Sequence, residues 1–183
     1  MAFRDTSSSY GIVTRLIHWM MALAIFFLFG LGWWMVGLDY YSAYYTKAPD
    51  LHRSLGIVVT LVLIFRFVWR LINIHPDDSE LSPLERLASK TVHWGFYPLL
   101  LALVVSGYFI STTDGRPVDV FGLFAVPSVV VSKEMTDTAG YIHRVLAYIT
   151  VILAGLHSAA ALKHHFVDHS SILKRMWSGS PKN

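Results

Sequence analysis

The chain has 183 residues, 54% of them hydrophobic, and a formal net charge of +3 at pH 7. Charged residues make up 15% of the chain, against about 25% in a soluble domain, and long stretches lack Asp, Glu, Lys and Arg: 16–38, 91–113 and 145–162. This composition excludes a soluble enzyme and a disordered protein. Because the chain has no Cys, it also excludes a disulfide scaffold, an iron–sulfur cluster and a covalently attached haem.

The apolar stretches predict four membrane spans, at residues 12–37, 49–72, 87–111 and 138–164. A helix needs about 20 mostly apolar residues to cross a bilayer. We therefore expect an all-α fold, a transmembrane four-helix up-and-down bundle, with residues 1–183 forming a single membrane domain.

Two of the links between the spans are informative. The link at residues 112–137 has an uncharged middle that contains Pro127 and is too short to cross a bilayer. We interpret this link as an interfacial segment folded onto the bundle. Residues 38–48 are rich in Tyr, which is typical of the aromatic belt at a membrane interface.

The basic residues predict the orientation. With four spans both termini lie on one side, and that side carries most of the 15 Lys and Arg residues. The positive-inside rule therefore places both termini in the cytoplasm. The pI is about 9.2, but the basic residues flank apolar stretches and do not mark one face, which argues against a nucleic-acid partner.

Histidines interrupt the spans at two depths. His18, His93, His143 and His157 lie within spans, and His52 lies in the first turn of another. Ionisable residues are rare inside membranes and usually functional there. His143 and His157 are about four helical turns apart, so they share one helix face and lie about 21 Å apart along it.

Depth limits which histidines can meet. His143 lies at the level of His52, whereas His157 could meet either His18 or His93, and the spacing leaves both partners open. Imidazoles from facing helices commonly hold haem iron from its two sides, so two levels of paired histidines predict two haems. Three glycines could give space for close approach near these ligands: Gly56, Gly140 and Gly155.

Other interpretations of the histidines remain open. A histidine inside a membrane can simply hydrogen-bond across helices. A haem-free proton or metal transporter also uses such residues.

Several stretches resemble the bacterial cytochrome b561 family, whose members are small four-helix dihaem membrane proteins. They are RLIHW at 15–19, LHRSLG at 51–56, the pair Arg66 and Arg70, GYIH at 140–143 and GLHSAAALKHH at 155–165. The residues FGL at 121–123, followed by Pro127, are also similar to the family. The resemblance covers nearly the whole chain, and the last motif is the most specific.

The resemblance implies two haem b groups, one held by His18 with His157 and the other by His52 with His143. It also implies electron transfer in a bacterial inner membrane, between a periplasmic donor and ubiquinone. His164 matches a position that lies beside the quinone in the superoxide-oxidising members. His93 then becomes a residue next to the ligands or on the quinone side.

Arginines near the ligands are candidate cofactor partners. Arg53 and Arg144 directly follow two of the ligands, so they could pair with haem propionates or attract an anion such as superoxide. Arg66 could hold propionates at the other level, whereas Arg70 is interpreted as a marker of the interface. All four could instead be ordinary interfacial arginines.

The sequence thus predicts a dihaem b-type cytochrome with a periplasmic electron donor. Superoxide as the donor would make it a superoxide:ubiquinone oxidoreductase. Alternatively, the same bundle would be a membrane anchor and electron-transfer module for a periplasmic protein, with residues 112–137 as its docking surface. The haem-free transporter is the third alternative.

Overall fold

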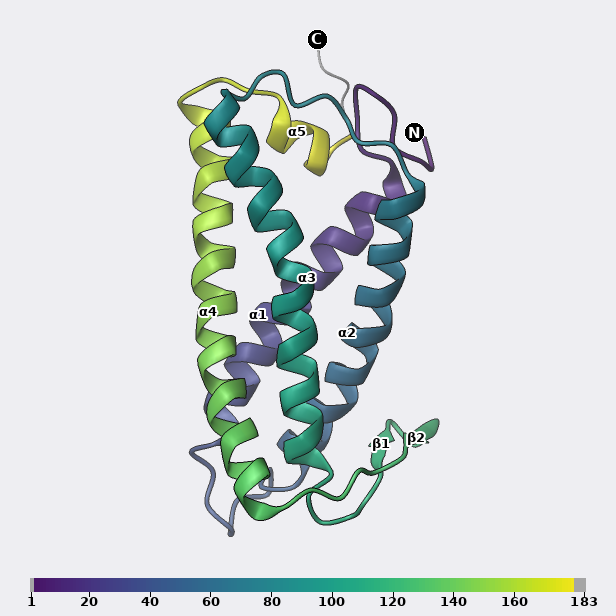
Figure 1. The fold of residues 1–183 in the computed structure, drawn as a ribbon, viewed down its shortest axis with the longest axis vertical. Helices are drawn as coiled ribbons and strands as arrows, with labels where there is room; N and C mark the ends of the chain where they lie inside the picture. The colour runs from purple at the N-terminus through teal and green to yellow at the C-terminus, as the bar shows by residue number, and fades with distance from the viewer. Residues whose placement is uncertain (1, 180–183) are drawn as a thin grey trace. The chain divides into compact units, whose positions relative to one another are not determined.

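Four long helices, joined in sequence, make up most of the computed structural model, which describes residues 2–179 (Figure 1). Their bounds are Ile12–Met35 for α1, Lys47–Ile72 for α2, Pro83–Ser111 for α3 and Lys133–Phe166 for α4. All four are long and apolar enough to cross a membrane. The prediction of an all-α fold with four spans is therefore confirmed.

Helix α3 begins four residues earlier than the sequence predicted, because a capping box starts it. The Ser82 backbone N–H and hydroxyl donate to the Glu85 carboxylate over 3.1 and 2.8 Å. The Glu85 backbone N–H donates in return to the Ser82 hydroxyl over 3.4 Å, and Pro83 takes the first helical position. Helix α4 also begins early, after Ser132, whose hydroxyl accepts the Met135 N–H over 3.2 Å.

Large apolar side chains stay exposed on all four helices. Examples are Leu23, Trp33, Ile64, Leu101 and Leu156. A water-soluble monomer rarely exposes apolar surface on this scale, whereas a lipid-facing surface requires it. The buried hydroxyls of Ser106 and Thr150 donate to carbonyls of their own helices, Ala102 and Leu146, each over 2.8 Å. These two hydroxyls are thereby satisfied without water.

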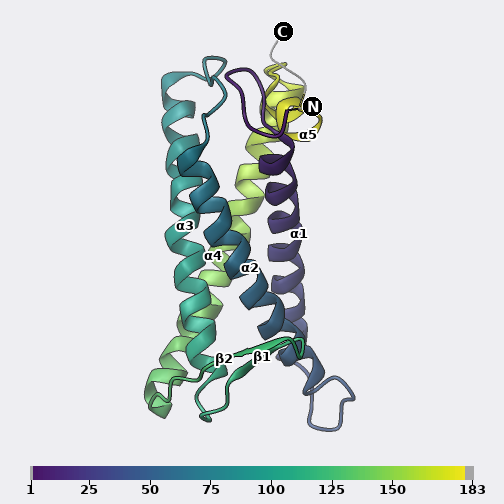
Figure 2. The same ribbon diagram turned by 90° about the vertical axis from the view of Figure 1, so that its right-hand side faces the viewer.

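The link after α3 contains a small β-hairpin and no fifth span. Strands β1 (Val118–Val120) and β2 (Phe124–Val126) pair antiparallel, with Val118 opposite Val126 (Figure 2). The turn between them uses Phe121 and Gly122 at φ values of 55° and 72°. In the described residues, none of the helices long enough to span a membrane lies in this link.

The chain divides into two compact units, each containing a section of every long helix. Within the described residues, the terminal unit comprises 2–22, 62–97 and 152–179, and the hairpin unit comprises 23–61 and 98–151. Each unit is treated by itself below.

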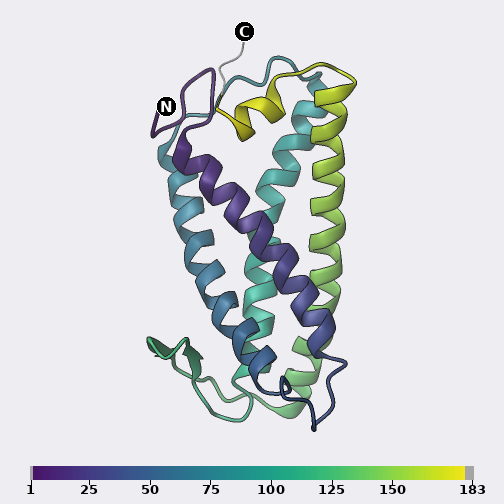
Figure 3. The ribbon, with the colours of Figure 1, turned by 180° about the vertical axis from the view of Figure 1, so that it is seen from behind.

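In the terminal unit, the short helix α5 (Ile172–Trp177) packs against the start of α1 (Figure 3). The Trp19 indole N–H donates to the Met176 carbonyl over 3.2 Å, and its ring meets the Trp177 ring edge-on at 5.2 Å. The Arg15 guanidinium donates to the Trp177 carbonyl over 2.8 Å. Helix α5 is thus fixed beside the helix that carries His18.

The C-terminal segment of this unit is also tied to the loop before α3. The Glu80 carboxylate accepts hydrogen bonds from the Ser170 hydroxyl, the Ser171 N–H and the Ser171 hydroxyl over 2.5, 2.8 and 2.7 Å. Burial raises the pKa of Glu80, but these hydrogen bonds outweigh it and lower the pKa to about 2. Arg175, only 2% exposed, donates to the Asp77 carbonyl over 2.7 Å.

In the hairpin unit, hydroxyl groups attach the link to the helices. The Ser54 hydroxyl on α2 donates to the Asp119 carbonyl over 3.0 Å. The Thr112 hydroxyl, fully buried at the end of α3, donates to the Val129 carbonyl over 3.0 Å. These bonds hold the hairpin at the end of α2 that carries His52.

Candidate cofactor sites

One pair of histidines meets in the hairpin unit. His52 on α2 and His143 on α4 have ring centres 6.2 Å apart, with an interplanar angle of 72°. Both residues lie on long helices. The pair that the sequence predicted from depth is therefore brought together.

A second set of histidines meets in the terminal unit. The ring centres of His18 on α1 and His157 on α4 lie 6.3 Å apart. His93 on α3 lies nearer to His157, at 5.0 Å, and its Nδ1 is 2.7 Å from the Ser89 carbonyl of its own helix. Three histidines thus lie close together here, and both partners that the sequence allowed for His157 are present.

The ring separations test whether one metal ion fits between two imidazoles. A metal–imidazole bond is about 2 Å long and the ring centre lies about 1 Å behind its nitrogen, so two rings on opposite sides of one iron have centres about 6 Å apart. The His52–His143 and His18–His157 separations fit this value. The 5.0 Å separation of His93 from His157 is shorter, so the geometry favours His18 as the partner of His157.

The ring of His143 is held by the backbone of α3. Its Nδ1–H donates to the Leu103 carbonyl over 2.8 Å, and the Ser106 hydroxyl lies 3.3 Å from the same nitrogen. This tautomer leaves the lone pair of Nε2 available for a metal, which is the usual arrangement for a ligating histidine. The chemistry of this donor therefore fits a ligand that would hold haem iron through Nε2.

Glycines lie directly against both imidazoles of the hairpin unit. A Cβ at Gly107 would lie 2.9 Å from Cε1 of His143, and a Cβ at Gly32 would lie 3.2 Å from Cε1 of His52. Real Cβ atoms almost never make the first contact, so only glycine allows the ring of His143 its place. Sequence reasoning missed both glycines, because no local pattern distinguishes them from glycines that serve plain helix packing.

The three glycines that the sequence predicted to give space near the ligands do not lie against an imidazole ring. A Cβ at Gly56, Gly140 or Gly155 would meet no atom within 4 Å. Gly56 follows His52 by one helical turn, and a Cβ there would lie in open space.

Arg66 lies against His18 in the terminal unit. Its Nη2 is 3.3 Å from His18 Nδ1, and a guanidinium can only donate, so Nδ1 accepts in this arrangement. A histidine that ligates through Nε2 carries its proton on Nδ1. Ligation by His18 would therefore release the guanidinium of Arg66 for another acceptor, such as a propionate.

Arg53, which follows His52 in sequence, lines a pocket of about 540 Å³. The pocket is formed by Lys47, Asp50, Leu51, Arg53, Ser54, Asp114, Arg116, Pro117, Val118, Asp119 and Phe121. Arg53 forms an ion pair with Asp50, and Arg116 pairs with Asp114 over 3.4 Å. Acidic and basic side chains therefore balance in the lining.

Arg144 is not among the residues that line this pocket. Its guanidinium lies over the ring of Tyr141, 5.9 Å from the ring centre, and both side chains are exposed. The structure thus separates the two arginines that the sequence treated alike.

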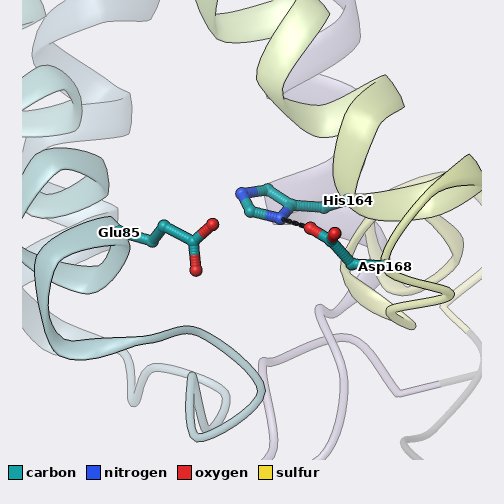
Figure 4. A group of neighbouring side chains, drawn as sticks. All are labelled: Glu85, His164 and Asp168. Atoms are coloured by element: carbon teal, nitrogen blue, oxygen red, sulfur yellow. Dashed lines mark hydrogen bonds and ion pairs between the residues drawn. The ribbon is translucent and has the colours of Figure 1, made fainter.

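His164 lies in a different cluster of the terminal unit, with Glu85 and Asp168 (Figure 4). Its Nδ1 is 2.7 Å from the Asp168 carboxylate. Lys163 bonds to both carboxylates, over 3.0 Å to Glu85 and 2.8 Å to Asp168. The hydrogen bond from Lys163, followed by that from His164, lowers the pKa of Asp168 below its ordinary value.

Comparison with known proteins identifies the family. Residues 9–179 match the family described as prokaryotic cytochrome b561. The chain belongs to this family. The cytochrome b561 family is a family of membrane electron-transfer proteins and implies a b-type haem. With its four apolar helices, the chain is therefore a bacterial membrane protein of this kind.

Three curated relatives match along nearly their whole length. Cytochrome b561 homolog 2 of Escherichia coli (strain K12) is 43% identical over 178 residues, which cover 96% of this chain and 95% of the relative. Probable superoxide oxidase CybB of Yersinia pestis is 28% identical, with 87% and 90% covered. Cytochrome b561 homolog 1 of Escherichia coli (strain K12) is 25% identical, with 87% and 92% covered.

Proposed function

We propose that this cytochrome b561 protein holds two b-type haems, one between His52 and His143 and the other between His18 and His157. The observation that carries the proposal is the nearly equal ring separation in the two pairs, 6.2 and 6.3 Å. When bound, haem supplies reversible one-electron chemistry at its iron. The chain supplies two half-buried imidazoles for each group, set among apolar helices.

The distribution of charge supports an orientation. Most Lys and Arg residues lie on the side of the termini, so we place the termini in the cytoplasm. The His52–His143 pair then lies toward the periplasm and the His18–His157 pair toward the cytoplasm. The protein accepts electrons on the periplasmic side and delivers them to ubiquinone near the cytoplasmic side.

Histidines of the terminal unit are suited to the quinone side. Reduction of ubiquinone to ubiquinol takes two electrons and two protons, so the site needs proton donors. His164, 14% exposed and bonded to Asp168, can hold a proton near the surface and release it. His93 is more enclosed and lies beside His157, where it can orient that ligand or face the quinone.

Superoxide is the proposed electron donor. Two superoxide anions would each lose one electron to become O2, while one ubiquinone gains both electrons and two protons. The relative named probable superoxide oxidase supports this donor. Lys47, Arg53 and Arg116 line one pocket with three aspartates, so any attraction of the anion there is local to each basic side chain, and Arg53 could also pair with a propionate.

A second candidate is a haem-containing membrane module that receives electrons from a periplasmic protein. The turn of the hairpin exposes Phe121, Leu123 and Phe124, which are 50%, 82% and 46% exposed. The neighbouring pocket is balanced in charge, which favours a polar protein surface as much as a small anion. The hairpin would then be the docking surface.

The haem content and the donor are tested on the purified protein in detergent. We expect two haems per chain and reduction by superoxide that falls steeply as salt is added, with ubiquinol as the product. Arg53→Gln should slow this reduction, and Arg144→Gln, which lies outside the pocket, is the matched control. Two haems with no response to superoxide would favour the docking module, and a haem-free protein would refute both proposals.

A further inference from the structure

Three side chains that commonly ligate metals meet where α3 begins and α4 ends. Glu85 comes from the first turn of α3, His164 from the last turn of α4, and Asp168 from the residues just after α4. One potential ligand atom from each lies within 4.8 Å of the other two. Figure 4 shows the Glu85 carboxylate facing the imidazole of His164 from the side opposite Asp168.

The three side chains are held in place before any ion arrives. Glu85 is fixed by the capping box with Ser82. Asp168 is fixed by the 2.7 Å contact with His164 and by a backbone hydrogen bond from its N–H to the Lys163 carbonyl over 3.3 Å. Such preorganisation reduces the entropy that ligands lose when they close around an ion.

A positive charge already lies between the two carboxylates. The Lys163 ammonium is 3.0 Å from Glu85 and 2.8 Å from Asp168. The side chain is 51% exposed, and a lysine ammonium is a point charge on a flexible stem. The two carboxylates therefore stabilise a cation at this position. The Lys163 ammonium that occupies it can rotate out into solvent.

We propose that Glu85, His164 and Asp168 form a binding site for a divalent first-row transition-metal ion such as Zn²⁺, which displaces the ammonium of Lys163. One imidazole nitrogen and two carboxylate oxygens suit an ion of borderline softness. Mg²⁺ and Ca²⁺ prefer sets of six or more oxygen ligands, so they bind weakly here. The site does not depend on the proposed electron transfer.

Competition with Lys163 distinguishes this site from a simple cluster of charges. If the ammonium occupies the place of the ion, its removal should strengthen metal binding. In an ordinary salt-bridge cluster, the same change would only leave two carboxylates without their partner. Lys163→Met, which keeps the length of the stem, is therefore the most informative variant.

The experiment uses the haem-loaded full chain, purified through a tag without histidine and treated with a chelator. Zn²⁺ is titrated by calorimetry, and the bound metal is counted after equilibrium dialysis. We expect one Zn²⁺ per chain, at least about tenfold weaker binding in His164→Ala and Asp168→Asn, and several-fold tighter binding in Lys163→Met. Excess Mg²⁺ should not compete.

His165→Ala is the matched control, because His165 lies next to His164 in sequence but lines a different pocket, with Phe166, His169 and Lys174. Its Zn²⁺ affinity should equal that of the unchanged protein. The proposal is overturned if the unchanged protein and Lys163→Met both fail to bind Zn²⁺. It is also overturned if His165→Ala, but not His164→Ala, abolishes binding. An unaltered haem spectrum shows that each variant is folded, and Glu85→Gln replaces any variant that is not.

Discussion

The two imidazole pairs have nearly the same ring separation but very different surroundings. In the hairpin unit, the ring of His143 is held by the Leu103 carbonyl and pressed against Gly107. In the terminal unit, His18 contacts the guanidinium of Arg66, and His157 has His93 as a second aromatic neighbour. Helix packing therefore sets the separation in both, while the atoms around each pair differ in charge and in stiffness.

This difference predicts different sensitivities. A backbone carbonyl fixes the ring of His143, so the hairpin-unit pair should respond most to changes of shape. Side chains that carry charge or protons surround the terminal-unit pair, so that pair should respond most to changes of charge. The two units are also held together at their ends by different bonds. In the hairpin unit the Ser54 hydroxyl bonds to the hairpin backbone, and in the terminal unit the Ser170 hydroxyl bonds to the Glu80 carboxylate.

Removal of a ligand is the largest expected effect. His143→Ala should lose only the hairpin-unit haem and His157→Ala only the terminal-unit haem, so each variant should retain about half of the haem, measured per chain as the pyridine complex. His93→Ala should retain both haems, because the separation of His93 from His157 is too short for a shared iron. Equal losses in His93→Ala and His18→Ala would show that the terminal pair is assigned wrongly.

A single methyl group tests the steric side of the comparison. Gly107→Ala would place Cβ 2.9 Å from the His143 ring, which its bond to Leu103 holds in place. We expect most of the hairpin-unit haem to be lost and the other retained. Gly32→Ala, at 3.2 Å from His52, should have a milder effect, and Gly95→Ala, with no atom within 4 Å, should have none. Full haem content in Gly107→Ala would contradict the idea of a rigid site.

The sequence predicted the helices well because apolar length alone defines a membrane span. The starts of α3 and α4 were missed, because capping residues such as Ser82 and Ser132 extend a helix into a polar segment. The hairpin was missed because its strands, Val118–Val120 and Phe124–Val126, have three residues each and show too little alternation to be recognised.

Within the candidate sites, the sequence predicted how deep each His and Arg lies along its helix, but not which way its side chain points around the helix. Helical spacing placed His18 and His93 at one level, and only the packed helices separate the 6.3 and 5.0 Å distances to His157. Arg144 follows His143 in sequence, yet successive residues point about 100° apart around a helix. Its side chain therefore lies over Tyr141 and away from the pocket.

Removal of a charge tests the other side of the comparison. Arg66→Gln takes a positive charge from beside His18, and a nearby positive charge favours the reduced form of a haem. We expect the terminal-unit haem to fall in midpoint potential by on the order of 60 mV, a tenfold change in a one-electron equilibrium, while the other haem stays unchanged.

A spectroscopic redox titration resolves the two haems and measures this shift. Arg70→Gln is the control, because it removes the same charge one turn further along α2, where the guanidinium lies over Trp94 at 5.2 Å. Its shift should be smaller. A larger shift in Arg70→Gln, or equal shifts of both haems in Arg66→Gln, would reverse the assignment of Arg66.

The smallest expected effect concerns the hydrogen bonds that Glu80 accepts from Ser170 and Ser171 in the terminal unit. Hydrogen bonds from Ser170 and Ser171 to Glu80 hold the pKa of its carboxyl at about 2, against 4.5 in an ordinary glutamate. Because the folded pKa is the lower one, the stabilisation is complete above about pH 4.5 and is lost as the pH falls toward 2. Glu80→Gln should therefore lower Tm by about 2–4 °C at pH 7, and the difference should shrink through this window. Thermal loss of the terminal-unit haem spectrum measures it. Ser170→Ala combined with Ser171→Ala should remove the same pH dependence; a difference that grew on acidification would mean that Glu80 does not stabilise this unit as a carboxylate.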